Sequence, residues 1–512
     1  MKSTLSPWQP VEGIVLVRNL GNILGTDCMS DRPAVIDLSD LACPVTYRYQ
    51  DLHQAASAYA RLLRARHFPP KTTIGIFALN SFHNLAAYMG IMQSGLVAVP
   101  VNTKLPAHTI KFVCKDARIE LAFADKKCRK IVPQGIELIT LPLSGYQGDS
   151  PISLEDIHRP ETGETAVILY TSGSTGRPKG VVLSHNSQWA MIKGTQQASN
   201  QSLFSGRRGI VAAPMFHMNA LIFITSFLSQ GGSIVLLPKF DAATFIEAIS
   251  RHEVNMITGV PTMIALMARE RNLLAQTDLS TVSHIFIGSS PVTDTVISQA
   301  LQMMPDSVIL NSYGTTETGG GLFGAHPDGL PRPTRSVGYP LPHIEIRLRG
   351  ESENTGVLEI KTPSAMTEYL NLPELTQDRI RDGWITTGDV FERDSDGFLF
   401  FIGRDDDMFV CNGENIYPSE IEKVIEHHTG VVQTCVVPLE HDIHGSIPVA
   451  FVVLKDTSKL NEKDITQYVL ENAPAYMHPR HVFILDTLPL AGTNKIDRNS
   501  LLQTARDRVK KS

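Results

Sequence analysis

Hydrophobic positions in the first part of the chain alternate between helical and strand-like spacing. After Asp51, apolar residues recur at intervals of three and four between Leu52 and Leu63, which predicts an amphipathic helix. Two uninterrupted apolar runs follow, at 74–79 and 96–101, and predict buried strands. Strands without polar alternation are typical of parallel sheets with both faces covered, so this region predicts βαβ units.

A second alternating series extends from Ile210 to Leu310. Its apolar runs predict further strands at 210–213, 233–237, 255–258, 284–287 and 307–310. The most apolar stretch, Asn219 to Leu237, is interrupted by polar residues well before ~20 apolar positions, so it predicts a buried helix and a strand, not a membrane span. We therefore expect an α/β fold with two doubly wound sheets side by side.

The pattern changes twice towards the C-terminus. Between Ser336 and Thr362, short alternating segments such as 344–348 predict a small antiparallel β-barrel that completes a large N-terminal domain. After 401–403 the pattern predicts a small α+β domain, with helices near 419–427 and 464–471 and strands near 431–437 and 449–454. The boundary between the two domains falls at 403–405.

Composition excludes several classes of protein. A chain of 512 residues with 42% apolar and 19% charged residues indicates a soluble globular protein of two or more domains. A net charge of -6, with no Lys/Arg run longer than a pair, argues against a nucleic-acid-binding surface. The six cysteines lack a Cys-x-x-Cys pair, so neither a disulfide framework nor a zinc site is indicated. Because the N-terminus lacks a signal-peptide pattern, we expect a cytoplasmic protein.

The segment 170–180, with the sequence YTSGSTGRPKG, carries the strongest chemical signal. It follows the apolar run 166–169 and combines glycines, hydroxyls and a lysine, which suits a loop that binds phosphate through backbone N–H groups. It is not a Walker A loop, because Gly180 follows Lys179. A flexible linker is the structural alternative. The candidate phosphate-binding residues are Thr171, Ser172, Gly173, Ser174, Thr175, Gly176 and Lys179.

Further motifs follow this loop in a fixed order: 213–217 (APMFH), 313–317 (YGTTE), 387–389 (TGD), 403–407 (GRDDD), 413–418 (GENIYP) and 494–498 (NKIDR). The ordered series resembles the adenylate-forming superfamily, and within it the aryl- and fatty acyl-CoA ligases. The resemblance implies an AMP-forming acid:thiol ligase that uses ATP, Mg²⁺ and coenzyme A. Such an enzyme joins a small-molecule carboxylic acid to AMP and passes the acyl group to a thiol.

The resemblance also implies roles for individual residues. Thr316 would contact the α-phosphate and Glu317 would bind the magnesium ion. Tyr313 would stack on adenine, within the motif that includes Gly314 and Thr315. The remaining nucleotide-binding residues would be Gly288, Ser289 and Ser290 beside adenine, and Asp389 and Arg404 at the ribose.

Two residues mark the division of labour between the domains. Lys495 resembles the lysine that reaches the substrate carboxylate and α-phosphate, although Asn494 replaces the usual glycine before it. Asp406 falls at the hinge position of the family. The implied domains are an ATP- and acid-binding core at 1–402, a hinge at 403–407 and a mobile lid at 408–512.

The acceptor and the acid are less defined by the motifs. Gly413 and Glu414 resemble the loop along the pantetheine path, with Cys411-Asn412 in place of Ser-Gly. His217 resembles the residue that gates the acyl pocket, and its structural alternative is a buried, hydrogen-bonded histidine. Nearby apolar residues and the glycines at 319–321 indicate a roomy pocket for an aryl or medium-chain acyl group.

Two alternative functions stay open at this point. The acceptor can be the phosphopantetheine of an acyl carrier protein in place of coenzyme A. A luciferase-like oxygenase is a more distant alternative. A monomer or a homodimer is expected.

Overall fold

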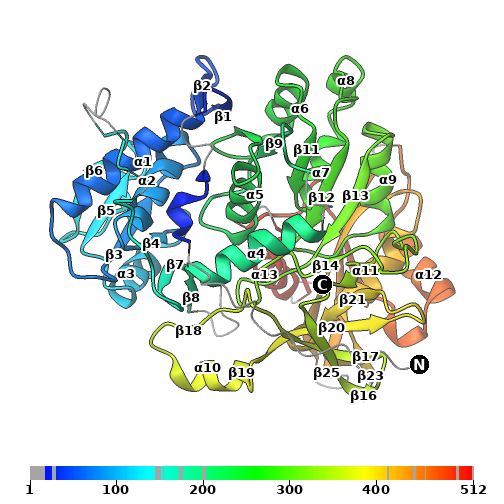
Figure 1. Ribbon diagram of the computed structural model, residues 1–512. Helices are drawn as coiled ribbons and strands as arrows, with labels where there is room; N and C mark the ends of the chain where they lie inside the picture. Colours follow the sequence, from blue (N-terminus) through cyan, green and yellow to red (C-terminus); the bar gives the residue numbers. More distant parts are fainter. Residues whose placement is uncertain are drawn as a thin grey trace.

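The computed structural model describes residues 18–25, 30–143, 151–153, 155–171, 177–198, 203–411, 414–441, 445–455, 457–491 and 495–509 (Figure 1). Its first sheet has the strand order β18-β8-β7-β4-β3-β5-β6. The strands are β3 (Thr73–Phe77), β4 (Val97–Pro100), β5 (Leu121–Ala124), β6 (Glu137–Thr140), β7 (Thr165–Thr171), β8 (Lys179–Ser184) and β18 (Glu368–Tyr369). β7, β4, β3, β5 and β6 are parallel, as predicted, and β8 and β18 form an antiparallel edge.

The second sheet has the order β13-β12-β11-β9-β10-β1-β2. It comprises β1 (Pro33–Asp37), β2 (Val45–Arg48), β9 (Arg208–Val211), β10 (Ser233–Leu236), β11 (Met256–Gly259), β12 (His284–Gly288) and β13 (Val308–Ser312). The strands expected between Ile210 and Leu310 are confirmed. β1 is an addition that the sequence pattern did not assign, because it pairs in parallel with β10 about 200 residues further along the chain.

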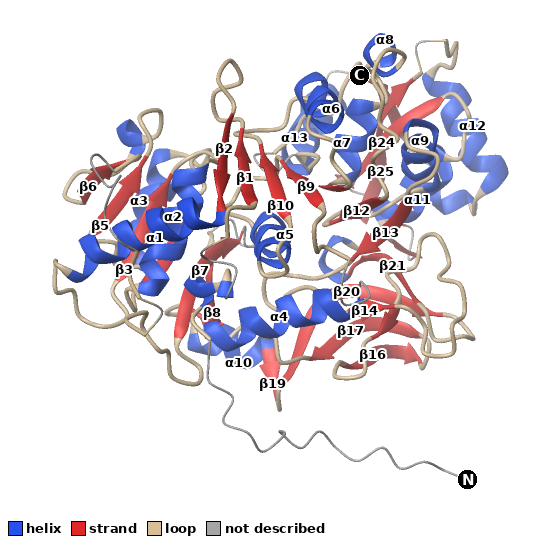
Figure 2. Ribbon diagram, turned by 45° about the horizontal axis from the view of Figure 1, so that its top comes forward, coloured by secondary structure: helices blue, strands red, loops and turns tan. Residues whose placement is uncertain are grey.

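Helices cover both sheets, as Figures 1 and 2 show. They are α1 (Tyr49–Arg64), α2 (Phe82–Gln93), α3 (Ala107–Asp116), α4 (His185–Ala198), α5 (Met218–Leu228), α6 (Ala242–Arg251), α7 (Pro261–Met267), α8 (Arg271–Leu274) and α9 (Asp294–Met303). The stretch from Asn219 to Leu237 is a buried helix followed by a strand, as predicted. Among the described helices, none is both long and apolar enough to cross a bilayer.

Asn80 ties the two sheets together. Its side-chain Nδ2 donates to the carbonyl oxygens of Ala213 (2.9 Å) and Leu237 (3.1 Å), and its Oδ1 accepts from the backbone N–H of Met215 (2.9 Å). Asn80 is only 2% exposed. A buried amide with all three bonds made is a strong local constraint, because breaking one bond leaves an unpaired polar group. The residue therefore fixes the loop after β9 against the first sheet.

A smaller antiparallel unit lies below the second sheet in Figure 1. It contains a five-stranded sheet and a two-stranded sheet that share one core, which includes Phe323, Leu358 and Phe391. Its elements are β14 (Phe323–Gly324), β15 (Tyr339–Pro340), β16 (Glu345–Ser352), β17 (Thr355–Lys361), α10 (Pro373–Arg379), β19 (Ile380–Arg381), β20 (Trp384–Arg393) and β21 (Leu399–Arg404).

The C-terminal α+β unit begins after β21. A short 3₁₀ segment at Asp405–Asp407 leads into a separate five-stranded sheet. Its elements are β22 (Phe409–Cys411), β23 (Glu414–Ile416), α11 (Pro418–Glu426), β24 (Val431–His441), β25 (Gly445–Leu454), α12 (Glu462–Asn472), β26 (His481–Ile484) and α13 (Arg498–Val509). Its two hydrophobic clusters contain only residues from Phe409 onward. Separate cores on the two sides of 403–407 are what the proposed division into core, hinge and lid requires.

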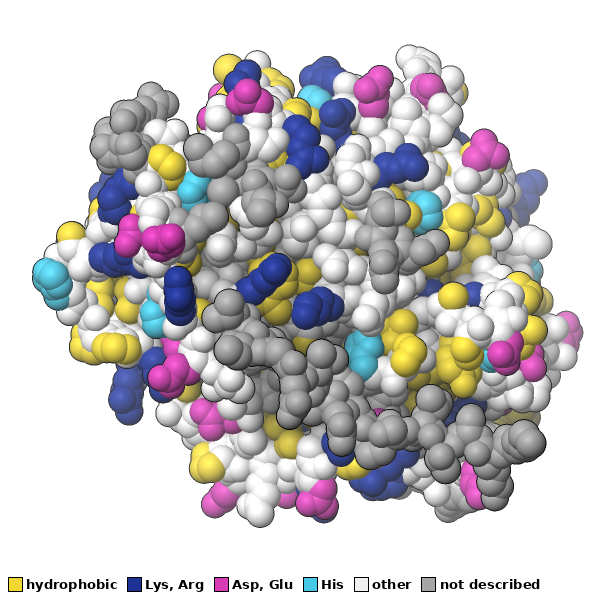
Figure 3. Space-filling view, in the orientation of Figure 1, with side chains coloured by type: hydrophobic (Ala, Val, Ile, Leu, Met, Phe, Trp, Pro, Cys, Tyr) yellow, Lys and Arg dark blue, Asp and Glu magenta, His cyan; other side chains and the backbone are white. Residues whose placement is uncertain are grey.

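Polar contacts between described residues connect this unit to the helices of the second sheet, among them the bond from Arg269 to the carbonyl oxygen of Asp486 (2.6 Å). The Thr295 hydroxyl donates to the carbonyl oxygen of Glu426 (2.9 Å), and His427 Nε2 lies 3.5 Å from Asp294 Oδ2. The start of α9 thus faces the end of α11. On the face shown in Figure 3, side chains of both charge signs are interspersed.

A carboxyl group is buried inside the C-terminal unit. Glu426 Oε1 accepts from the backbone N–H of Thr434 (2.8 Å), while the adjacent Glu422 forms an ion pair with Arg498 (2.8 Å). Burial raises the pKa of Glu426 to about 8, from an ordinary value of 4.5. Glu426 therefore keeps its proton in the folded protein at neutral pH.

We expect Glu426→Gln to remove a pH dependence of stability. Because the pKa of Glu426 is raised in the folded protein, its contribution to the free energy of unfolding is fully present below pH 4.5. The contribution is lost as pH rises towards 8, by up to about 1.4 kcal/mol per pH unit. The variant's Tm advantage over the wild type should grow between pH 5 and 8 and level off above 8, in thermal melts. Exposed Glu440→Gln is the control. Parallel Tm profiles of wild type and Glu426→Gln would contradict the assignment.

Candidate active site

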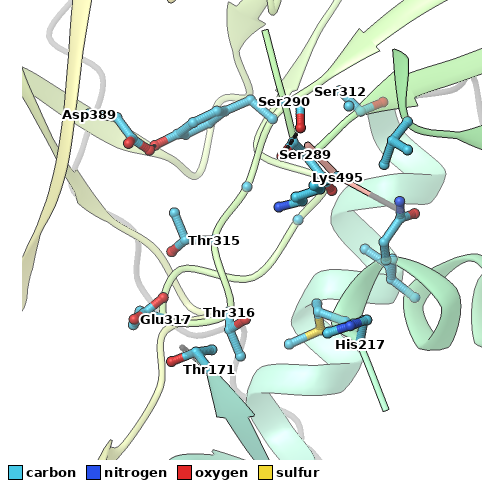
Figure 4. A pocket seen from close by; sticks show the side chains of 18 of the residues that line it. Thr171, His217, Ser289, Ser290, Ser312, Thr315, Thr316, Glu317, Asp389 and Lys495 are labelled. Atoms are coloured by element: carbon cyan, nitrogen blue, oxygen red, sulfur yellow. Dashed lines mark hydrogen bonds between the residues drawn. The ribbon is translucent and has the colours of Figure 1, made fainter. Parts of the chain in front are cut away.

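A cavity of about 1000 Å³ lies where the two sheets, the antiparallel unit and the C-terminal unit meet. Of the described residues predicted for the site, all but Glu414 line it: Thr171, Lys179, His217, Gly288, Ser289, Ser290, Tyr313, Gly314, Thr315, Thr316, Glu317, Asp389, Arg404, Asp406 and Lys495 (Figure 4). Ser172, Gly173, Ser174, Thr175, Gly176, Asn412, Gly413 and Asn494 lie outside the described residues. The structure therefore brings motifs from the whole length of the chain to one place.

The ends of the phosphate-loop hairpin open onto this cavity. Thr171 ends β7, Lys179 begins β8, and the two residues are cross-strand partners. Residues 172–176, between these strands, lie outside the described part of the chain, while Thr171, Pro178 and Lys179 line the cavity. Burial, followed by the nearby Arg379, lowers the pKa of Lys179.

A tight turn presents Thr316 and Glu317. Thr315 and Thr318 hold the turn reciprocally, because the backbone N–H of each donates to the hydroxyl of the other (3.1 Å in both cases). Gly319 N–H then donates to Thr315 O (2.9 Å). The two central residues of a turn closed in this way point outward, which places both side chains in the cavity, as Figure 4 shows.

Close backbone packing shapes the cavity wall at Gly288, Ser289 and Ser290, the segment predicted to lie beside adenine. A Cβ on Gly288 would lie 2.3 Å from the carbonyl oxygen of Ser312, so only glycine fits there. The next residue, Ser289, has φ +64°, a left-handed conformation that is costly for serine and is typical of functional loops. Gly288, Ser289 and Ser290 thereby form a closely packed part of the cavity wall at the end of β12.

Tyr313 and Asp389 lie together on the cavity wall next to Gly288, because Tyr313 follows Ser312, the cross-strand partner of Gly288. The Tyr313 hydroxyl donates to Asp389 Oδ2 at 2.6 Å, and its ring contacts Phe391 edge-on at 4.8 Å. Burial raises the pKa of Asp389, and the bond from Tyr313 opposes the shift. Asp389 Oδ1 lies 3.8 Å from Arg404 Nε. This oxygen is the one left to accept a bond from a ligand.

Arg404 connects this wall to the segment predicted as the hinge. Its guanidinium binds the Asp406 carboxylate in two places, at 2.7 and 3.3 Å. Burial disfavours its charge, but Asp406 and Asp389 more than offset this and raise its pKa. Arg404 stays cationic at any working pH.

Lys495 reaches the cavity from the C-terminal unit. Figure 4 shows its amine directed into the space bordered by Ser289, Thr315 and Thr316. Burial, followed by the charge of Arg404, lowers the pKa of Lys495. A desolvated ammonium group beside other cations is destabilised unless an anion joins it.

His217 forms the boundary of a second part of the cavity. It is the N-cap of α5, its ring lies 4.5 Å from the Phe216 ring, and its Nε2 has no hydrogen-bond partner among the described residues. Burial lowers the pKa of His217 to about 3, helped by the charge of Lys495. The ring is therefore neutral at working pH, and the hydrogen-bonded alternative for this residue is not found within the described part of the chain.

The glycines at 319–321 pack closely against neighbouring segments. A Cβ on Gly319 would lie 2.9 Å from Ser364, one on Gly320 2.9 Å from Ile222, and one on Gly321 2.4 Å from the Thr195 nitrogen. These glycines thus allow the loop to approach α4 and α5. All three glycines also line the cavity, so the expectation that they leave room in the pocket stays a prediction.

Glu414 is the predicted site residue that does not reach the cavity. It is exposed, begins β23 and pairs with Cys411 of β22. Cys411 is buried in the core of the C-terminal unit. The role of Glu414 along a pantetheine path stays a prediction.

Sequence profiles of known families match most of the chain. The AMP-binding enzyme profile matches residues 26–370, and the AMP-binding enzyme C-terminal domain profile matches 420–495. The chain belongs to the AMP-binding enzyme family.

Named relatives of this AMP-binding enzyme activate different acids. It is 28% identical over 461 residues to a 2-succinylbenzoate–CoA ligase of Bacillus subtilis (89% of this chain, 93% of the relative). It is 29% identical over 477 residues to a fatty acid–[acyl-carrier-protein] ligase of Streptomyces coeruleorubidus (89% and 91%). The o-succinylbenzoate CoA synthetase of B. subtilis, solved with its acyl-adenylate OSB-AMP, superimposes with a TM-score of 0.79 at 26% identity (94% and 97%).

Two functional residues of this AMP-binding enzyme were missed by the sequence analysis. The hydroxyl of Tyr369, on β18, donates to Glu317 Oε1 at 2.7 Å, and Tyr369 is only 1% exposed. Arg379, at the end of α10, lines the cavity and donates to the carbonyl oxygen of Thr386 (2.6 Å). Tyr369 lies 52 positions from Glu317, and only the pairing of β18 with β8 brings the two residues together. Arg379 lies 7 positions from Thr386 and belongs to none of the motifs.

The Glu317 site suits a magnesium ion that also binds phosphates. Among the described residues there is no group of three metal-ligating His, Cys, Asp or Glu side chains. Magnesium often uses one or two carboxylates and completes its shell with water and substrate phosphates. With Oε1 held by Tyr369, Glu317 presents Oε2 in a fixed direction.

We expect Tyr369→Phe to weaken the binding of MgATP. Without the hydroxyl, Glu317 loses its fixed orientation, so the apparent Kd for MgATP should rise about three- to tenfold, in isothermal titration calorimetry, and half-maximal activity should need more Mg²⁺. Tyr49→Phe is a matched control, because its buried hydroxyl binds Leu228 O and Gly232 O outside the cavity. An unchanged Kd together with a lowered Tm in both variants would show that Tyr369 is purely structural.

Proposed function

We propose that this AMP-binding enzyme is an ATP-dependent carboxylic acid:CoA ligase. The observation that carries the proposal is the location of Lys495. This residue of the C-terminal unit lies in a cavity formed by the phosphate-loop ends, the Thr316–Glu317 turn and Asp389. Cations and N–H donors converge there, while no acid–base pair is needed for the first step.

The first half-reaction activates the acid. A carboxylate oxygen attacks the α-phosphorus of ATP, a new C–O–P bond forms, and the bond to the β-phosphate breaks as pyrophosphate leaves. Negative charge grows around the α-phosphorus, and fixed cations lower this barrier. Lys495 and the Thr316 hydroxyl act at that phosphate, and Lys179 with Arg379 stabilises the leaving pyrophosphate. A magnesium ion on Glu317 would neutralise part of the phosphate charge.

The second half-reaction transfers the acyl group. A thiol attacks the carbonyl carbon of the acyl-adenylate, loses its proton, and AMP leaves. Lys495 occupies the cavity in the present arrangement, so a thiol arriving from that side requires the C-terminal unit to move. We assign residues 403–407 as the hinge, with 1–402 as the core and 408–512 as the lid, because each side has its own hydrophobic core.

Coenzyme A is the proposed thiol. The relatives include one ligase whose acceptor is an acyl carrier protein, and that acceptor is the second candidate. Purified protein with ATP, Mg²⁺ and a panel of aryl and medium-chain acids should release AMP and pyrophosphate and form a CoA thioester. Acylation of carrier protein without CoA thioester would favour the second candidate. Absence of acid-dependent pyrophosphate–ATP exchange across the panel would overturn the proposal.

We expect Lys495→Ala to separate the two half-reactions. Acid-dependent pyrophosphate–ATP exchange should fall at least a hundredfold, because the α-phosphate loses its cation. Thioester formation from supplied acyl-adenylate and CoA should persist. Lys463→Ala removes an exposed lysine of the same unit and serves as the control. Equal losses in both assays would contradict a role confined to adenylation.

We expect Asp406→Pro to have the opposite effect. Proline fixes φ near -65°, which suits the 3₁₀ segment and restricts rotation at the hinge. Exchange should be largely retained, while single-turnover thioester formation should slow at least tenfold. Asp406→Ala removes the same carboxylate from Arg404 but leaves the backbone free, so it should retain both steps. Equal rates of thioester formation in the two variants would remove Asp406 from the hinge.

A further inference from the structure

One face of α5 forms a wall of the acyl part of the cavity. Beyond the N-cap His217, the side chains of Asn219, Ile222 and Phe223 line the cavity, at the i, i+3 and i+4 spacing of one helical stripe. Phe223 belongs to an aromatic cluster. Its ring centroid lies 5.7 Å from Phe286 and 6.4 Å from Phe204, both of which also line the cavity. This end of the cavity therefore suits a flat apolar group.

Asn219 is a polar exception on this wall. The hydroxyl of Thr258, at the end of β11, donates to Asn219 Oδ1 at 3.0 Å. Thr258 is only 2% exposed, so this bond is protected from water. Because Oδ1 accepts this bond, the orientation of the amide is fixed, and Nδ2 is the polar group that can bind a ligand. Among the described residues no acceptor is bound to Nδ2.

An amide donor in an apolar pocket discriminates between ligands. A ligand that offers an oxygen to Nδ2 replaces the water that the donor loses, whereas a wholly apolar ligand leaves the donor unpaired. Sites that form such a bond reject the analogue lacking the partner much more strongly than apolar pockets reject a change in size. The Asn219–Thr258 pair is thus suited to selection of the acid.

We propose that Asn219 is a specificity-determining residue that selects aromatic acids carrying a neutral hydrogen-bond acceptor, such as a hydroxyl or methoxy oxygen. The aromatic body lies against Phe204, Phe223 and Phe286, and the acceptor oxygen faces α5. Thr258 positions the Asn219 amide. This inference rests on the proposed ligase function.

Matched acids test the inference. Pyrophosphate release is measured with saturating ATP and CoA for benzoate, for cinnamate and for their hydroxy and methoxy derivatives at each ring position. Octanoate is included in the same assay. In the wild type, kcat/KM for the best acceptor-bearing acid should exceed that of its parent at least tenfold. Asn219→Leu should reduce this ratio to within about twofold, mainly through KM.

Two further variants sharpen the test. Asn219→Asp keeps the size of the side chain but replaces the donor by an acceptor. The kcat/KM for the methoxy acid should therefore fall at least tenfold relative to that for the hydroxy acid, which can donate a hydrogen bond. Thr258→Val frees the amide and should lower the preference partially, while Thr258→Ser should retain it. Asn186→Leu, at the start of α4, is the control, because its side chain binds the Gly163 N–H at an exposed position.

The outcomes separate the two proposals. Without acid-dependent pyrophosphate release for any acid, the ligase function itself is wrong. The role of Asn219 alone is wrong if pyrophosphate is released with no preference for acceptor-bearing acids. It is also wrong if that preference persists in both Asn219→Leu and Asn219→Asp. If Asn219→Leu does not fold, judged by its Tm, the Asn219→Asp and Thr258→Val comparisons decide.

Discussion

The accumulation of positive charge in one desolvated cavity is the constraint on which the site depends. Lys179, Arg379, Arg404 and Lys495 all line the same space, and burial lowers the pKa of both lysines. Asp406 pairs with Arg404 and Asp389 accepts a bond from Tyr313, so these carboxylates offset the charge only partly. An anionic ligand between these groups removes the repulsion and makes each cation more favourable. We therefore expect nucleotide binding to favour the position in which Lys495 of the C-terminal unit lies in the cavity.

The sequence predicted the framework of the fold well where the signal was local. Apolar runs such as 233–237 and 284–287 depend on neighbouring residues, and the observed strands β10 and β12 agree with them. The position of β1 was not predictable in this way, because β1 pairs with β10 across about 200 residues. Periodicity shows that a strand is buried, but not which sheet receives it.

The same distinction holds within the site. The ordered motifs predicted many of the residues that line the cavity, but other polar lining residues, such as Asn219, Thr258 and Arg379, lie outside the predicted set. The supporting contacts were missed: Tyr369 meets Glu317 only because β18 adds to the edge of the first sheet, and Thr258 meets Asn219 only because β11 ends beside α5. The close contacts of the glycines at 319–321 with neighbouring segments were also not predictable, because a sequence does not show what faces a missing Cβ.

The three hydrogen bonds of Asn80 have a consequence for how such an enzyme changes its acid over evolution. The Asn80 amide binds Ala213 and Met215, which shortly precede His217, from the loop between β3 and α2 of the first sheet. The contact between the two sheets thereby fixes the position of the segment before His217, at the proposed acyl part of the cavity. The width of the cavity there does not depend on its lining residues alone. Exchanges along α5 can retune which acids are accepted, whereas a change at Asn80 would disturb every acid alike. Changes in acid preference are therefore expected at a few positions on α5, while the contact between the two sheets stays the same.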